Sequence, residues 1–194
     1  MSAAKSNTII IGVDPGTLIT GYGIIEARHG RWSMIACNAV KNSPHQSMPI
    51  RLKKIYDSLC LVIEQYHPDE FAIETAFYGK NAQSALKIGH ARGVAILAAV
   101  NFQIPTTEYA PREIKKSITG NGAASKQQVQ FMVKSQLQIR ETSKLFDITD
   151  ALAVALCHAY RHGNVSLRQT KTSSKTRSWT NYIKQHPEKI GRLS

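Results

Sequence analysis

The strongest constraint on the fold comes from residues Thr8 to Val13, which read Thr-Ile-Ile-Ile-Gly-Val. A β-branched run without polar interruption is typical of a central strand that is buried on both faces of a sheet. Asp14 follows directly, and Asp14 to Thr17 read Asp-Pro-Gly-Thr, which is a turn sequence. The sequence therefore predicts a carboxylate at the end of a buried strand, where open α/β sheets bind their ligands.

The rest of the chain alternates strand-like and helix-like segments. Two more strands are predicted at Gly21 to Ala27 and at Trp32 to Val40, joined near His29, so that the chain opens with a three-stranded meander. The following segments are expected to be a helix over Met48 to Tyr66, a strand at Phe71 to Ile73, a helix over Asn81 to Val100, a strand over Ile104 to Tyr109, a short helix from Pro111, a helix from the N-cap Ser125 to Leu137, and a last helix from near Leu145 to Tyr160. This order predicts an α/β fold of the ribonuclease-H-like kind, with a five-stranded mixed sheet flanked by helices.

The charge of the chain favours a partner with a phosphate backbone. The 194 residues carry a net charge of +12, and a cationic surface gains affinity for nucleic acids by releasing condensed counterions. From Arg161 to the end there are eight Lys or Arg against one Glu, among many Ser and Thr. We expect one domain of the ribonuclease-H-like fold over residues 1–162 and a basic, flexible tail over 163–194 that adds affinity for DNA.

Other sequence features exclude several classes of protein. No apolar run approaches the roughly 18 to 20 residues of a membrane span, and the N-terminus lacks the apolar region of a secretory signal, so a cytoplasmic location is expected. Cys37, Cys60 and Cys157 are odd in number and have no C-x-x-C spacing, which argues against a disulfide framework or a thiolate metal site. We expect them to be buried apolar residues.

Four carboxylates form the candidate site. Asp14 and Glu74 each end a predicted strand, whereas Asp147 and Asp150 lie three residues apart at the start of a helix and share one of its faces. Carboxylates that meet repel one another and raise their pKa values unless cations lie between them. Oxygen ligands suit Mg²⁺ or Mn²⁺ better than zinc, and two such ions could catalyse in-line phosphodiester hydrolysis that leaves a 5′-phosphate and a 3′-hydroxyl. Taken singly, each residue also fits a turn or a helix cap.

Blocks of sequence around these carboxylates resemble the RuvC family of Holliday-junction resolvases. The blocks are Gly12-Val13-Asp14-Pro15-Gly16-Thr17 with Thr20-Gly21-Tyr22-Gly23 behind it, Ala72-Ile73-Glu74 followed by Phe77, Lys80-Asn81-Ala82 and Ser84-Ala85-Leu86-Lys87, then Ala91-Arg92-Gly93-Val94-Ala95, and Asp147-Ile148-Thr149-Asp150-Ala151-Leu152-Ala153 with His158. The likeness covers about Ile9 to Tyr160. Motifs in this order and at this spacing are highly specific.

The resemblance implies a function and its partners. The four carboxylates would be catalytic ligands of Mg²⁺, and the substrate would be a four-way DNA junction. The family acts as a homodimer that cuts two opposed strands symmetrically in recombination and repair, beside a branch-migration motor of the RuvA and RuvB type. Ala85, Gly89 and Gly93, at four-residue spacing, are our candidate dimer seam. Tight packing of these small residues against the protomer's own sheet is the alternative.

The loop after Glu74 is expected to contact DNA. The family places an aromatic residue at the position of Phe77, where the ring can stack on an unpaired base at the open centre of the junction. Tyr78 is a second candidate for such stacking, and Lys80 is a candidate phosphate contact. A loop anchor buried in the core is the structural alternative for Phe77.

Other basic residues match family positions near the scissile phosphate. Lys115 and Lys126 are candidates to hold that phosphate and to offset transition-state charge, although most lysines simply face solvent. Arg92 is either a contact with the DNA backbone or a packing residue. For His158, two turns beyond Asp150, we expect a structural role rather than metal ligation.

Three other functions compete with a junction resolvase. Asp14 to Thr17 also resemble the phosphate loop of actin-like ATPases and sugar kinases, but those enzymes need two related domains and this chain has room for one. A ribonuclease-H-like nuclease that processes structured RNA would share the opening strand and its aspartate. A junction-binding module without catalysis is the third possibility, although all four carboxylates are present.

Overall fold

The computed structural model describes residues 8–28, 31–75, 82–139 and 146–162. Its elements in chain order are β1 (Ile9–Asp14), β2 (Ile19–Arg28), β3 (Arg31–Lys41), α1 (Met48–Tyr66), β4 (Glu70–Glu74), α2 (Ala82–Asn101), β5 (Thr106–Tyr109), α3 (Pro111–Thr119), α4 (Lys126–Leu137) and α5 (Phe146–Arg161). The strands form one sheet in the order β3-β2-β1-β4-β5. The pairs β1–β2 and β2–β3 are antiparallel, whereas β1–β4 and β4–β5 are parallel. The predicted meander and the mixed five-stranded sheet are confirmed.

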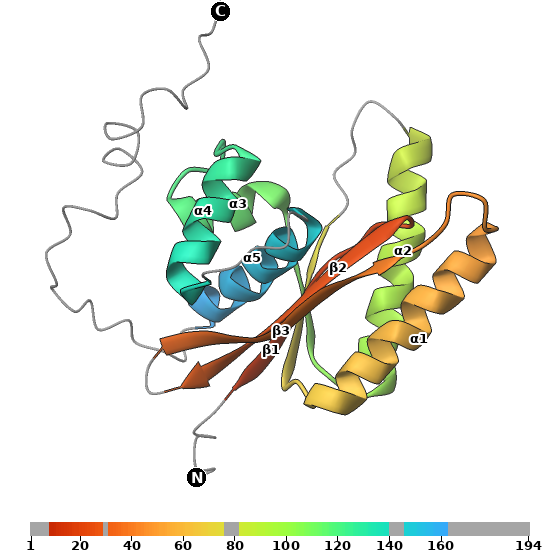
Figure 1. The fold of residues 1–194 in the computed structure, drawn as a ribbon, viewed down its shortest axis with the longest axis horizontal. Coiled ribbons are helices and arrows are strands. Elements are labelled where there is room, and N and C mark those ends of the chain that lie inside the picture. Colours follow the sequence, from red (N-terminus) through yellow and green to blue (C-terminus); the bar gives the residue numbers. More distant parts are fainter. Residues whose placement is uncertain (1–7, 29–30, 76–81, 140–145, 163–194) are drawn as a thin grey trace, which may run out of the picture.

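Strand β1 lies at the centre of the sheet and contributes side chains to two hydrophobic cores, one on each face of the sheet. Ile10 packs in the core beneath α3, α4 and α5, whereas Ile11 and Val13 pack in the core beneath α1 and α2. The molecule therefore has three layers, with α1 and α2 on one side of the sheet and the three later helices on the other (Figure 1). Burial on both faces is the reason why this strand is apolar at successive positions.

Glycines allow α5 to lie directly against the sheet. A Cβ atom at Gly12 would be 2.3 Å from the carbonyl oxygen of Ala151, and one at Gly21 would be 2.1 Å from that of Asp147. The backbone of α5 therefore touches β1 and β2 without intervening side chains. Helix α5 is almost entirely buried from Ile148 to Ala159, so its position is set by the core.

The structure shows the predicted N-cap of α4 and three cysteines without a disulfide. Ser125 is the N-cap of α4, where its side chain accepts a hydrogen bond from the backbone N–H of Gln128 at 3.2 Å. The cysteines carry no disulfide; Cys157 is buried as expected, whereas Cys37 and Cys60 are only half-buried because they lie at the edges of the cores. In the described parts of the chain, no helix is long and apolar enough to cross a membrane.

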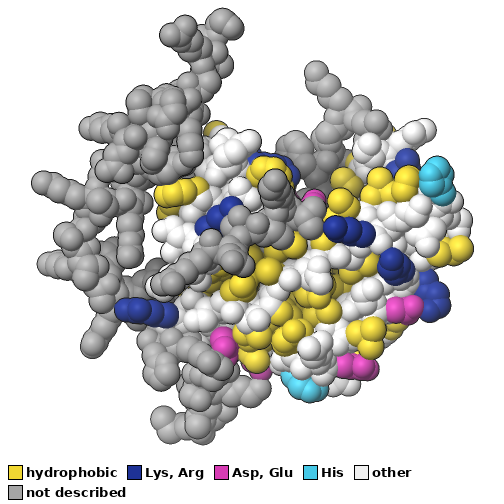
Figure 2. Space-filling view, in the orientation of Figure 1, with side chains coloured by type: hydrophobic (Ala, Val, Ile, Leu, Met, Phe, Trp, Pro, Cys, Tyr) yellow, Lys and Arg dark blue, Asp and Glu magenta, His cyan; other side chains and the backbone are white. Residues whose placement is uncertain are grey.

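Charge is mixed on the face of the molecule that carries α1. Figure 2 shows Lys and Arg side chains interspersed with Asp and Glu on this side. One such pair joins Lys53 to Asp57 at 2.5 Å. The basic tail predicted over residues 163–194 lies outside the described residues, so its separation from the domain stays a prediction.

Candidate active site

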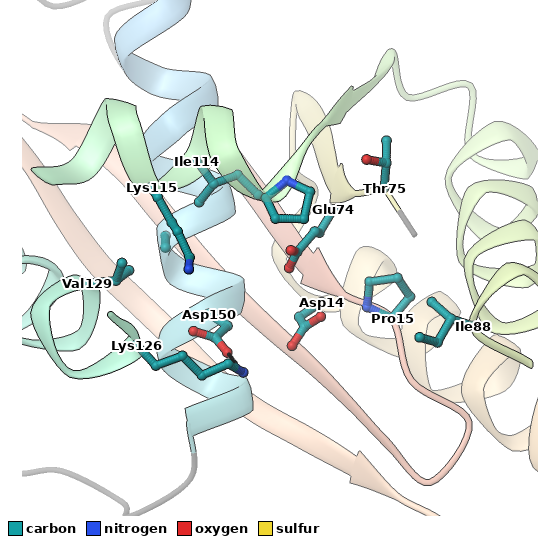
Figure 3. Close-up of a pocket in the computed structure, with 12 residues that line it drawn as sticks. Asp14, Pro15, Glu74, Thr75, Ile88, Ile114, Lys115, Lys126, Val129 and Asp150 are labelled. Carbon is teal, nitrogen blue, oxygen red and sulfur yellow. Dashed lines mark hydrogen bonds and ion pairs between the residues drawn. The ribbon is translucent and has the colours of Figure 1, made fainter. Parts of the chain in front are cut away.

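Two carboxylates meet at the carboxyl edge of the sheet because their strands are parallel neighbours. The register pairs Val13 of β1 with Ile73 of β4, so Asp14 and Glu74 occupy equivalent positions one residue later. Asp150, one turn into α5, faces them from the helical layer (Figure 3). The three side chains line one pocket of about 280 Å³. The convergence of strand ends and helix face expected from the sequence is therefore present for these three residues.

Asp147 lies beside this group rather than in the pocket lining. It is in the first turn of α5, and its carbonyl oxygen lies against Gly21 of β2. Its charge still reaches the site, because it contributes to the rise in the pKa of Asp14. The fourth carboxylate is thus within electrostatic reach of Asp14.

The electrostatics of the pocket are those of crowded, partly desolvated acids. Burial, with the charges of Asp150 and Asp147, raises the pKa of Asp14 to about 6. Burial, with the charges of Asp14 and Asp150, raises the pKa of Glu74 to about 8. Removing water from a carboxylate and placing like charges beside it both disfavour ionisation. At neutral pH the pocket therefore holds less negative charge than its number of carboxylates suggests. A bound cation would favour the ionised carboxylates and so restore this charge.

Two lysines bring positive charge to the same pocket. Lys126, the first residue of α4, places its Nζ 2.9 Å from Oδ2 of Asp150, and this hydrogen bond raises the pKa of Lys126. The Lys126 charge also lowers the pKa values of Asp14 and Glu74 against the larger raising effects. Lys115 of α3 lines the pocket as well (Figure 3). The structure therefore brings both predicted lysines to the carboxylates.

The apolar wall of the pocket was not anticipated from the sequence. It includes Ile88 of α2, Ile114 of α3 and Val129 of α4. These residues carry no reactive group, and their spacing indicates only that each helix has an apolar face. Only the packing of three helices around the strand ends shows that these faces border the site.

The other residues predicted to contact DNA do not line this pocket or lie outside the residues that the structure describes. Arg92 of α2 forms an ion pair with Glu108 of β5, which supports the packing interpretation of this arginine. Phe77, Tyr78 and Lys80 lie outside the described residues.

His158 is remote from the carboxylates and is held by hydrogen bonds. Its ring is buried, with Nδ1 2.8 Å from the hydroxyl of Tyr109 in β5 and Nε2 bonded to Glu70 in β4. Burial lowers the pKa of His158, although the bond to Glu70 opposes the shift. These contacts fit the structural role that was expected.

The small residues of α2 do not pack against the protomer's own sheet. A Cβ atom at Gly89 or Gly93 would meet nothing within 4 Å. Helix α2 buries another face, formed by Ala91, Ala95, Ala98 and Ala99. The alternative of close packing within the protomer is therefore wrong for the two glycines.

Known proteins are similar to this chain both in sequence and in fold. A family model described as crossover junction endodeoxyribonuclease RuvC matches residues 10–158. The crossover junction endodeoxyribonuclease RuvC of Christiangramia forsetii is 44% identical over 189 residues, covering 97% of this chain and 96% of the relative. That of Desulforamulus reducens is 50% identical over 151 residues, covering 78% of this chain and 93% of the relative.

A solved structure agrees with these relatives. T. thermophilus RuvC in complex with Holliday junction substrate superposes with a TM-score of 0.75 at 29% identity, covering 80% of this chain and 94% of that protein. Together with the five-stranded mixed sheet, this likeness confirms the ribonuclease-H-like fold. The chain described here belongs to the RuvC family of crossover junction endodeoxyribonucleases.

Proposed function

We propose that this protein is a structure-selective endonuclease that resolves four-way DNA junctions by hydrolysing phosphodiester bonds. The observation that carries the proposal is the meeting of Asp14, Glu74 and Asp150 with Lys115 and Lys126 in one pocket at the carboxyl edge of the sheet. Carboxylates and lysines in one pocket suit a metal-assisted reaction at a phosphate. Membership of the RuvC family supports the junction as the substrate.

The donor set of the pocket fits a hard divalent cation. Its ligands are carboxylate oxygens, the kind that Mg²⁺ prefers, and their raised pKa values reflect negative charge brought together out of water. Asp14, Glu74 and Asp150 would hold the ions, two per site, with Asp147 beside them. The chemistry that Mg²⁺ or Mn²⁺ supplies when bound is activation of a water and stabilisation of the leaving oxygen, which yields a 5′-phosphate and a 3′-hydroxyl.

The two lysines act on the substrate rather than on the ions. Lys115 and Lys126 come from different helices and reach the pocket from the side opposite Glu74 (Figure 3). There they would hold the scissile phosphate and offset the negative charge that grows on it in the transition state. Lys126 must exchange its contact with Asp150 for the phosphate when DNA and metal bind.

A homodimer is proposed through the outer face of α2. Leu86, Leu97 and Val100 are 63%, 51% and 54% exposed, and Gly93 lies on the exposed side among them. A two-fold symmetric junction calls for a two-fold enzyme whose subunits share an isologous interface. Leu97→Glu is expected to dissociate the dimer without unfolding the protomer, because it places a charge on the exposed face of α2 but leaves the core unchanged. Analytical ultracentrifugation would check this, with exposed Leu61→Glu on α1 as the matched control.

The remaining contacts stay predictions. Two of them, stacking by Phe77 and added DNA affinity of residues 163–194, involve residues that the structure does not describe. Action beside a RuvA- and RuvB-type motor is implied by the family resemblance alone. Truncation after His162 tests the tail. We expect weaker junction binding and a shallower dependence on salt, because fewer phosphates are neutralised. Unchanged affinity and salt slope would contradict a DNA-binding role for the tail.

The decisive experiment measures cleavage of three substrates by the purified protein. A synthetic four-way junction, a linear duplex of the same arms and a structured RNA are compared in Mg²⁺ and in EDTA. We expect symmetric nicks in the junction, only with Mg²⁺, that DNA ligase can reseal because the ends are a 5′-phosphate and a 3′-hydroxyl. Preferred cleavage of the RNA would instead favour an RNA-processing nuclease. Junction binding without any metal-dependent cut would favour a binding module.

Variants of the carboxylates test the site itself. Asp14→Asn, Glu74→Gln, Asp147→Asn and Asp150→Asn are each expected to abolish cutting and to leave junction binding largely intact, because each removes a negative charge in or beside the proposed metal site. Glu64→Gln, which changes an exposed carboxylate on α1, is the matched control and should cut normally. Turnover retained in two of the four variants would refute the assignment.

A further inference from the structure

A second group of metal-ligating side chains lies at the opposite ends of two elements that form the active site. Glu70 begins β4, whereas His158 and His162 lie at the end of α5 and just beyond it. One donor atom from each of the three lies within 4.8 Å of the others. At 1.5 Å per helical residue, His158 is about 12 Å along α5 from Asp150, so this group is separate from the carboxylate pocket.

His158 is already oriented in the way that metal-binding histidines are. It is 2% exposed, its Nδ1 is 2.8 Å from the hydroxyl of Tyr109, and its Nε2 faces the carboxylate of Glu70. A histidine that binds a metal through one ring nitrogen commonly donates its other N–H to a fixed acceptor, which sets the tautomer and the ring orientation. Tyr109 is placed to be that acceptor.

His162 supplies a third donor that can adjust. It follows His158 by four residues, and its backbone N–H donates to the His158 carbonyl at 3.1 Å, so it continues the last helical turn. The two imidazole rings lie 4.3 Å apart between centroids. Because His162 is exposed, its side chain can rotate towards an ion, and the open side leaves room for water as a fourth ligand. Two histidines at i and i+4 with a carboxylate form a set that suits zinc.

The charged groups around the cluster leave the Glu70 carboxylate free to bind a metal ion. Arg161 lies between the two histidines in sequence, but its guanidinium pairs with Glu113 at 2.8 Å and lies over the Tyr109 ring. It therefore does not occupy the Glu70 carboxylate, whose described ion-pair partner is His158.

We propose that Glu70, His158 and His162 bind a divalent transition metal, with Zn²⁺ as the best match to two imidazoles and one carboxylate. Metal binding by His158 differs from the sequence prediction, which gave this residue a structural role rather than metal ligation, and it does not depend on the nuclease activity. The bound ion would join the C-terminal end of α5 to the start of β4. These are the elements that carry Asp150 and Glu74 at their other ends, so the site stabilises the frame of the active site without taking part in the reaction.

The test titrates Zn²⁺ against a chromophoric chelator, with Mg²⁺ in large excess so that it competes for the carboxylate pocket. His162→Gln is the main variant because its side chain is exposed and its loss leaves the core intact, and Glu70→Gln is the second. His45→Gln, at another exposed histidine, is the matched control. We expect one Zn²⁺ per protomer in the wild type and in the control, and at least about tenfold weaker binding in both cluster variants.

Thermal unfolding gives an independent readout. Zn²⁺ should raise the Tm of the wild type and of His45→Gln, but should raise it much less for His162→Gln, since a ligand stabilises only the state that binds it. Junction cleavage in Mg²⁺ should be the same for His162→Gln and the wild type, so this result is independent of the proposed function. Zn²⁺ affinity that is equal in the wild type and both cluster variants, or absent from all of them, would overturn the proposal.

Discussion

Glu74 is expected to destabilise the metal-free protein as the pH rises. Its pKa increases from 4.5 to about 8 on folding, mainly through burial and then through the charges of Asp14 and Asp150. Between these two values the folded state binds more protons than the unfolded state, so stability falls with rising pH across this window. At about 1.4 kcal/mol per pKa unit the full effect is at most about 5 kcal/mol. Glu74 is partly exposed, so water and side-chain movement should reduce it to about 2 kcal/mol.

The perturbation that isolates this effect is Glu74→Gln, which keeps the size of the side chain and removes its charge. Urea unfolding in EDTA should show the variant more stable than the wild type by about 2 kcal/mol above pH 8, with a difference within about 0.5 kcal/mol near pH 5. Glu64→Gln, at an exposed carboxylate of α1, should show neither the gain nor the altered pH dependence.

Magnesium provides the complementary measurement. Ions held between the carboxylates favour their ionised forms, so Mg²⁺ should stabilise the wild type above pH 8 and should stabilise Glu74→Gln much less. Calorimetric titration near pH 7 should also detect proton release on Mg²⁺ binding, because the raised pKa of Glu74 keeps part of this carboxylate protonated before the ion binds. A variant no more stable than the wild type in EDTA above pH 8 would refute the reasoning.

Two further substitutions follow from the packing and the charges of the site. Gly12→Ala should destabilise the protein by about 3 kcal/mol in thermal unfolding, because the new Cβ would lie 2.3 Å from the backbone oxygen of Ala151. Lys126→Met should lower junction cleavage by about 10²-fold. It should also move the rising limb of the pH–rate profile to higher pH, because Lys126 lowers the pKa values of Asp14 and Glu74. An unmoved limb would show that these carboxylates do not control the rate.

Local chemistry in the sequence determined the elements and the edge at which the site forms. The unbroken β-branched run before Asp14 predicts a strand buried on both faces, and the structure places it at the centre of the sheet. Ser125 predicts a helix start because its side chain can satisfy a backbone N–H of the first turn, which it does. Asp14 and Glu74 were predicted to belong to one site because each ends a strand, where open α/β sheets bind ligands, and the parallel pairing of β1 with β4 brings them together.

Tertiary packing alone decided which side chains face one another. Asp150 reaches Asp14 because Gly12 and Gly21 let the backbone of α5 lie on the sheet, a contact between segments more than a hundred residues apart. The pairing of Lys126 with Asp150 and the cluster of Glu70 with His158 arise in the same way. Periodicity in a sequence specifies which face of a helix is apolar, but the partner of that face is chosen by the shapes of all the elements when they pack together.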